Sequence, residues 1–290
     1  MRRYIIKRLI LFIPVVIGVV TFVFLIIHLI PGDPVDMMLG ETAQQADKEI
    51  LRIQLGLTDP IYLQYYRFIK GVVSGDLGIS IHFNQPVIEI IIDRFPATLE
   101  LTLGAMVIAI LISIPLGIIA ASRQYSIFDN TSMLLALVGI SMPNFWLGPL
   151  LIILFSIDLG WLPVSGKEGL THLILPSITL GTSMSAILSR MTRSSLLEVI
   201  REDYITAARA KGLSEGVIMV KHALTNALLP IITIIGLQFG SLLAGSIITE
   251  TIFSWPGVGR LTIQSIITRD YPLVQGCVLF IALCYVVVNL

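Results

Sequence analysis

Six long stretches without Lys, Arg, Asp or Glu constrain the fold of this chain more than any other feature of its sequence. A helix rises about 1.5 Å per residue, so about 20 apolar residues cross the roughly 30 Å hydrocarbon core of a bilayer. Only 13% of the 290 residues are charged, against about 25% in a typical soluble domain. We therefore predict an all-α polytopic membrane protein with six transmembrane helices, at Leu9–Ile30, Leu101–Ala121, Thr131–Ile157, Leu173–Ser189, Ala223–Thr249 and Tyr271–Leu290.

The distribution of the cations predicts the orientation of these helices. If the N-terminus is cytoplasmic, the inner segments contain eleven of the nineteen Lys and Arg residues, and the longer outer segments contain eight. Short cytoplasmic segments of membrane proteins are enriched in cations, so we predict a cytoplasmic N-terminus and a cytoplasmic loop at 194–226. The net charge of zero argues against a nucleic acid as a partner.

The six uncharged stretches also define the predicted segments of the chain. Residues 1–30 form the cytoplasmic N-terminus and the first transmembrane helix, and 31–96 form an ordered extracytoplasmic subdomain with nine acidic and five basic residues. Residues 97–290 hold the other five helices. The last run stops at Leu290 without a flanking cation or polar tail, so we expect the chain to be truncated there.

The predicted cytoplasmic loop contains the longest charged passage in the second half of the chain. Leu197, Ile200, Tyr204 and Ala208 follow helical spacing, which predicts one apolar helix face across this passage. An amphipathic helix outside the membrane but close to it is typical of a part that docks into another protein.

A glycine predicts where this helix ends. Gly212 can adopt the left-handed conformation at C′, which places Leu213 at C″ against Ala208 at C3 in a Schellman motif. Ser214 can then cap a second short helix that runs through Val217 and Ile218. We therefore predict two helices that meet at a sharp bend.

Several motifs resemble those of one transporter family. Thr206-Ala-Ala208, followed by Gly212 and Leu224, resembles the EAA loop of ABC-importer permeases, although Thr206 and Thr225 stand where Glu and Pro are usual. The chain is similar to the dipeptide/oligopeptide/nickel permeases over nearly its whole length. Further matching motifs are Pro31-Gly-Asp-Pro34, Pro96-Ala-Thr-Leu-Glu100, Ser141-Met-Pro-Asn-Phe-Trp-Leu147, His222-Ala-Leu-Thr-Asn-Ala-Leu-Leu-Pro230, Phe253-Ser-Trp-Pro-Gly-Val-Gly-Arg260 and Arg269-Asp-Tyr-Pro272.

The resemblance implies the transmembrane domain of a type I ABC importer in the inner membrane. It implies a pore-forming subunit that works with a second related permease, two ATPase subunits and an extracytoplasmic substrate-binding protein. ATP and magnesium would be bound by the ATPases, so we expect no cofactor in this chain. The residues expected to couple to an ATPase are Ala207, Ala208, Gly212, Leu213 and Ser214. Family chains continue past the sixth helix to a cytoplasmic tail, which agrees with truncation.

Catalytic and metal sites are not expected. The segment Gly160–Glu168 resembles a P-loop, but its spacing is wrong and Glu168 stands where Ser or Thr must hold magnesium. The four histidines are scattered, and Cys277 and Cys284 lie too far apart on a helix for a disulfide. We therefore predict that the chain is not an enzyme and binds no metal ion.

Polar residues in the apolar runs are candidates for a translocation path, because polar side chains in a bilayer usually face protein or water. These are Ser141, Asn144, Gln238 and Ser241. The turn Trp255-Pro256-Gly257, with a short helix after it, is predicted to be either an outer gate or an aromatic anchor at the lipid headgroups.

The expected function is ATP-driven import of dipeptides or oligopeptides, and import of a nickel chelate is the alternative within the family. A stand-alone secondary transporter is less favoured, because the halves look dissimilar and Glu250 lies close to a helix end. The sequence does not define the peptide length, the pore-lining residues or the partner subunits.

Overall fold

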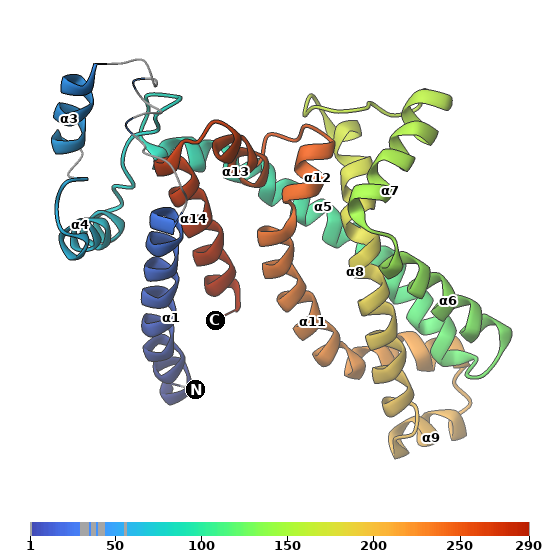
Figure 1. The fold of residues 1–290 in the computed structure, drawn as a ribbon. Helices are drawn as coiled ribbons and strands as arrows, with labels where there is room; N and C mark the ends of the chain where they lie inside the picture. Colours follow the sequence, from blue (N-terminus) through green and yellow to red (C-terminus); the bar gives the residue numbers. More distant parts are fainter. Residues whose placement is uncertain (1, 30–34, 36–38, 40–43, 55–56, 290) are drawn as a thin grey trace. The chain divides into compact units, whose positions relative to one another are not determined.

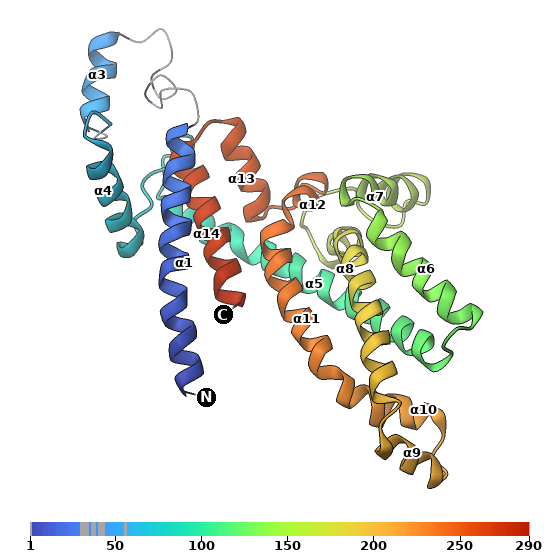
Figure 2. The same ribbon diagram turned by 60° about the horizontal axis from the view of Figure 1, so that its bottom comes forward.

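The computed structural model describes all residues except 1, 30–34, 36–38, 40–43, 55–56 and 290. The described residues form helices joined by turns, with one isolated β-bridge between Ile79 and Pro86. The motif Pro31–Pro34 lies outside them. The helices are α1 (Arg2–Leu29), α3 (Gln45–Gln54), α4 (Ile61–Ser74), α5 (Val87–Ser122), α6 (Ile127–Ser141), α7 (Asn144–Leu151), η1 (Ile152–Asp158), α8 (Leu170–Val199), α9 (Asp203–Ala210), α10 (Glu215–Val217), η2 (Ile218–Ala223), α11 (Leu224–Gly245), α12 (Ile247–Ile252), α13 (Val258–Ile267) and α14 (Tyr271–Asn289) (Figures 1 and 2).

Four single helices in the described part of the chain are long and apolar enough to cross a membrane: Val87–Ser122, Leu170–Val199, Glu215–Ala244 and Tyr271–Asn289. A bent pair, Ile127–Ser141 with Asn144–Asp158, adds a fifth crossing if it is one span. The first predicted span lies in α1, whose described apolar part, Ile10–Leu25, is shorter. The all-α polytopic fold is confirmed, whereas the count of six spans and the orientation stay predictions.

The predicted helix Thr131–Ile157 is broken. Its two halves meet at an angle of 100°, and the break falls at Met142 and Pro143. Met142 is extended (φ −84°, ψ 113°) because the proline ring after it disfavours helical geometry. Pro143 then serves as the N-cap residue of α7. An apolar run without charge was therefore not enough to predict one straight helix.

The chain forms two compact units, Met1–Thr98 with Pro256–Leu290, and Leu99–Trp255. In the first unit α1 and α14 lie side by side, and Val20, Val23 and Leu279 are buried between them (Figures 1 and 2). The buried Asp270 ties the loop before α5 to the α13–α14 turn. Its carboxylate accepts hydrogen bonds from the hydroxyl of Ser80 and from the backbone N–H of His82 (3.0 Å).

In the second unit α8 is the central helix, and α6 and α11 pack against it. Glycines allow close approach to α5. A Cβ added to Gly181 would lie 2.6 Å from the carbonyl oxygen of Ala105. An ion pair joins α6 to α8, since Arg193 Nε and Nη2 donate to the two carboxylate oxygens of Asp129 at 2.6 and 2.7 Å. The start of α6 is thereby held to the last third of α8.

Candidate functional site

The predicted turn after α9 is present. Gly212 has a φ of +77°. The N–H of Leu213 donates to the carbonyl of Ala208 (3.4 Å), and the N–H of Gly212 donates to that of Arg209 (2.9 Å). These are the two hydrogen bonds of a Schellman motif, so the predicted C-terminal end of α9 is confirmed.

The predicted helix face across this passage is wrong. The helix that contains Leu197 ends at Val199, and α9 begins at Asp203 after the extended residue Glu202 (φ −72°, ψ 147°). One extended residue changes the rotation of the following helix, so spacing counted across the break does not define one face. Tyr204 is consequently exposed.

The inner face of α9 consists of Ile205 and Ala208, which are buried. They pack in a cluster with Leu196 of α8 and with Ile218 and Met219 of η2. Ala208 therefore supports the surface from inside. α9 lies beyond the end of α8 in both views (Figures 1 and 2), and the cluster holds it there.

The outer face of this region is exposed. It carries the other four residues expected to couple to an ATPase: Ala207, Gly212, Leu213 and Ser214. Leu213 and Val217 are each about two-fifths exposed and add apolar area to it. We call this surface, formed by Thr206, Ala207, Ala210, Lys211, Gly212, Leu213, Ser214 and Val217, the α9 surface. A rigid backbone under a mostly uncharged exposed face suits docking into a groove of another protein.

The segment after Ser214 differs from the prediction. Ser214 occupies the N-cap position, but its side chain makes no capping hydrogen bond. The predicted second short helix is the first turn of a much longer one, since α10, η2 and α11 follow one another without a break. The π-helical turn η2 joins the α9 surface directly to the membrane-spanning helix. A shift of the α9 surface can therefore act on α11 without an intervening loop.

Two side-chain contacts that sequence reasoning missed hold the bend. Arg209 Nε and Nη2 donate to the carboxylate of Glu215 at 2.7 and 3.2 Å, across the Gly212 turn. This hydrogen-bonded pair raises the pKa of the Arg209 guanidinium. Asn226 Nδ2 donates to the Tyr204 hydroxyl at 2.7 Å, which ties α9 to α11. Sequence separations of 6 and 22 residues across a turn carry no periodic signal.

The four candidate path residues lie in the second unit on three helices. Ser141 ends α6, and its hydroxyl donates to the carbonyl of Leu137 at 2.8 Å. Asn144 begins α7, on the other side of the break. Gln238 and Ser241 lie on α11, the first half-buried and the second exposed. In the described part of the chain no hydrogen bond joins any two of them, so a common path stays a prediction.

Trp255 does not fit the anchor interpretation. Its side chain is completely buried, and its backbone N–H donates to the carbonyl of Glu250 at 2.8 Å. Lys167 Nζ lies 5.5 Å from the centre of the indole ring and forms an ion pair with Glu100 (2.7 Å). An aromatic anchor at the headgroups would need an exposed ring. The same contacts give the P-loop-like segment a structural role through Lys167.

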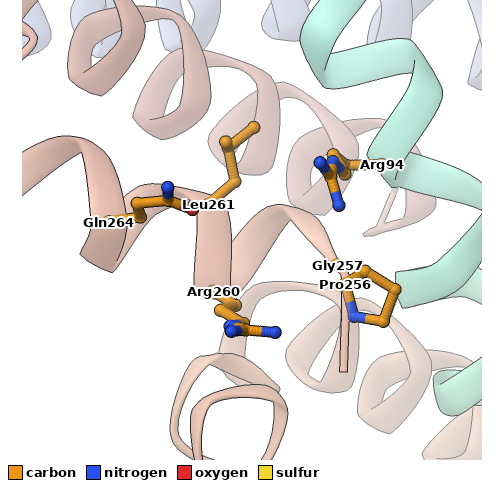
Figure 3. A pocket seen from close by; sticks show the side chains of 6 residues that line it. All are labelled: Arg94, Pro256, Gly257, Arg260, Leu261 and Gln264. Carbon is orange, nitrogen blue, oxygen red and sulfur yellow. The ribbon is translucent and has the colours of Figure 1, made fainter. Parts of the chain in front are cut away.

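Pro256 and Gly257 belong to the first unit and line a shallow pocket there with Leu261. Its polar lining comes from Arg94 of α5 and from Arg260 and Gln264 of α13, as Figure 3 shows. Arg94 Nε is buried and has no hydrogen-bond partner among the described residues. Two guanidinium groups and an amide, with no carboxylate among the lining residues, suit an anionic group.

The described residues contain no group of three or more His, Cys, Asp or Glu side chains that could hold a metal ion.

Solved structures define the class. An amino acid ABC transporter with histidines matches 69% of this chain and 88% of its own chain, with a TM-score of 0.51 and 20% identity. The MetNI methionine ABC transporter in an inward-facing conformation matches 69% and 93%, with a TM-score of 0.53 and 19% identity. The fold is therefore that of an ABC-importer transmembrane domain.

The family follows from the sequence comparisons. The family described as "Binding-protein-dependent transport system inner membrane component" matches residues 113–290. A second family model, which describes the N-terminal part of such membrane components, matches residues 1–102. The chain belongs to this family. It is a multi-pass transport permease of the inner membrane and not an enzyme.

Individual relatives narrow the branch. The dipeptide transport system permease protein DppB of Alkalihalophilus pseudofirmus is 46% identical over 318 residues, which cover 100% of this chain and 96% of the relative. DppB of Escherichia coli is also 46% identical, with 100% and 95% covered. The glutathione transport system permease protein GsiC of Escherichia coli reaches the same identity and coverage. These relatives confirm the resemblance to the dipeptide/oligopeptide permeases.

Proposed function

We propose that this chain is the pore-forming subunit of an ATP-driven importer for short peptides, and that it receives the energy of ATP hydrolysis through the α9 surface. The observation that carries the coupling role is the architecture of that surface. Its inner face is buried, its outer face is exposed, and the segment after it continues directly into α11. Such a surface is rigid enough to transmit a movement of a partner into a membrane-spanning helix.

The proposed complex contains a second related permease, two ATPase subunits and an extracytoplasmic binding protein. ATP and magnesium would be bound by the ATPases. The family description names a binding protein as part of the transport system, which supports this set of partners. Nucleotide binding and hydrolysis would then shift the balance between inward-open and outward-open states, because each nucleotide state favours one of them.

The proposed substrates are dipeptides and oligopeptides. One relative is named for dipeptide transport and another for glutathione transport, at the same identity, which favours short peptides as a class. A nickel chelate is the alternative substrate. Ser141, Asn144, Gln238 and Ser241 are proposed for the translocation path, and the turn Trp255-Pro256-Gly257 for the outer gate. Since Trp255 is buried, its part in a gate would be to support the turn.

Uptake by the complete transporter in vesicles tests the function. Labelled dipeptide should accumulate with ATP and binding protein present, and a proton gradient alone should not drive uptake. Labelled nickel chelate serves as the competing substrate. Uptake that depends on the proton gradient and not on ATP would support a secondary transporter. Uptake of the nickel chelate without uptake of dipeptide would identify the chelate as the substrate.

A charge on the α9 surface tests the coupling role separately. Ala207 is exposed, so Ala207→Asp should leave the permease folded and inserted. A charge that is buried without a partner on docking costs several kcal/mol, so ATPase binding should weaken by about tenfold or more. Ala207→Ser is the matched control of similar size without charge. If Ala207→Asp binds the ATPase and transports like the control, the α9 surface is not the docking site.

A further inference from the structure

Helix α4 belongs to the segment predicted to lie outside the membrane, yet it packs against α1, which contains the first predicted span. The Tyr65 hydroxyl and the Thr21 hydroxyl are 2.6 Å apart. The Phe24 ring meets Tyr65 edge-on at 5.2 Å and stacks on Phe68 at 5.8 Å, measured between ring centres. Both views place α4 beside the half of α1 that is nearer its C-terminal end (Figures 1 and 2).

The residues that α4 contacts on α1 and α14 lie well away from the ends of those two helices. Phe68, Ile69 and Val72 pack against a buried cluster formed by Val20, Val23 and Leu279. Val20 precedes the end of α1 by nine residues, and Leu279 follows the start of α14 by eight. At about 1.5 Å per residue, this cluster lies roughly 10 Å or more below the ends of both helices. If α1 and α14 both cross the membrane, this depth corresponds to lipid chains rather than to water.

One flank of α4 is apolar and has no partner within the described chain. Tyr62, Tyr66 and Val73 are 72%, 63% and 82% exposed. Their spacing of four and seven residues places them on one side of the helix, next to the flank that contacts α1. The opposite side carries the polar residues Gln64, Arg67, Lys70 and Ser74. The helix is therefore amphipathic, with an apolar sector wider than its contact with α1 requires.

We propose that this exposed flank of α4 is embedded in lipid, in the leaflet at which α1 ends. On the neighbouring helix α1, Phe22 and Leu25 are also exposed within the described part of the chain. Tyrosines beside arginine and lysine are the side chains that membrane proteins place at the boundary between acyl chains and headgroups. Amphipathic helices of this composition bind that boundary through apolar burial and through attraction to anionic lipids.

The consequence concerns the segment 31–96. The cation distribution predicts that this segment is extracytoplasmic, where the exposed flank of α4 would anchor it to the outer leaflet. The polar helix α3 and the loop before α5 would then be held at a set height above the membrane. This role is independent of the substrate and of the α9 surface.

Spin labels on neighbouring residues of α4 test the proposal in the assembled transporter in lipid vesicles. The background is the full chain with Cys277→Ala and Cys284→Ala. Val73→Cys reports the apolar flank, and Ser74→Cys, one residue further on, reports the polar side. Ile17→Cys, on the exposed side of α1, is the lipid reference. Collisions with oxygen, which concentrates in lipid, are compared with collisions with a water-soluble nickel chelate.

The label at residue 73 should collide mainly with oxygen, as at residue 17, and the preference should invert at residue 74. Tyr62→Cys repeats the measurement at the other end of the flank and should match residue 73. If residue 73 behaves like residue 74, α4 lies in water above the membrane and the proposal is wrong. Protection of residue 73 from both reagents would mean that a partner subunit covers the flank, which would also overturn it.

Discussion

Gly212 is the residue on which the geometry of the α9 surface depends most. Its φ of +77° lies in the left-handed region, which costs a β-branched side chain roughly 1–2 kcal/mol or more. A Cβ at this position would meet nothing within 4 Å, so the cost of a substitution is conformational and not a clash. A larger residue here should therefore re-aim the segment after Ser214 without disturbing the packing around it.

We predict that Gly212→Val inserts into the membrane and pairs with its partner permease, but loses most transport and no longer couples hydrolysis to substrate. Gly216→Val is the matched control, because Gly216 lies four residues away, is equally open and has no positive φ. Gly212→Asn should be largely tolerated, since asparagine adopts the left-handed conformation at low cost. Substrate uptake and ATPase activity in reconstituted vesicles measure both properties. Normal coupled transport by Gly212→Val would refute the role of the bend.

The pair between Asp129 and Arg193 is the second residue-scale determinant. Asp129 is buried, and Arg193 occupies both of its carboxylate oxygens. Arg193→Leu would leave a buried carboxylate without its partner, so we predict a loss of about 3 kcal/mol in stability. The double variant Asp129→Asn with Arg193→Leu should recover much of it. Thermal unfolding in detergent measures this, and additive losses in the double variant would mean that the two residues act independently.

At the scale of elements, α5 and α8 approach each other closely at Gly181 in the second unit. A Cβ on Gly181 would lie 2.6 Å from a backbone oxygen of α5, so the two helices would have to separate. We predict that Gly181→Ala destabilises the permease by about 1–3 kcal/mol. Gly236→Ala, on α11, is the control because a Cβ there meets nothing within 4 Å. Equal melting temperatures for the two variants would contradict the close packing.

The connection from α9 to α11 is the other element-scale feature. The turn Lys211–Ser214 joins α9 to α10, and η2 then joins α10 to α11 without a loop. The hydrogen bond between Tyr204 and Asn226 ties α9 to α11. A shift of α9 would therefore move the start of α11. The same unit contains the bend of 100° between α6 and the pair α7–η1. Within a membrane, backbone N–H and C=O groups at such a bend need hydrogen bonds from protein or water.

At the scale of the whole molecule, the orientation in the membrane decides which partners each surface can meet. The cation distribution predicts that α9 is cytoplasmic and that α3 is outside. A cysteine at Glu215 should therefore resist impermeant thiol reagents in intact cells, and a cysteine at Glu49 on α3 should react. Permeabilised cells serve as the control, in which both should react. The reverse pattern would refute the orientation and with it the coupling role of the α9 surface.

The sequence by itself determined the features that depend on local chemistry. Long uncharged runs predict membrane helices because lipid excludes charge and unpaired backbone groups, and the long apolar helices of the described chain overlap those runs. Gly212 predicted the Schellman turn because few other residues adopt its φ at low cost. The loop motifs also identified the family, because each motif consists of residues that are close together in the sequence.

Only the tertiary structure decided what each residue meets. Ala207 and Ala208 are neighbours with the same side chain, yet one is exposed and the other is buried under a cluster from α5, α8 and η2. Trp255 was predicted to belong to an outer gate or to be an aromatic anchor, and its side chain is buried. Helix α4 was predicted to belong to an ordered extracytoplasmic subdomain, and it packs against α1. Burial depends on elements that are distant in sequence, and one extended residue, such as Glu202, changes the direction of every side chain after it. A local sequence pattern shows neither which distant element covers a residue nor where an extended residue will change the direction of the side chains after it.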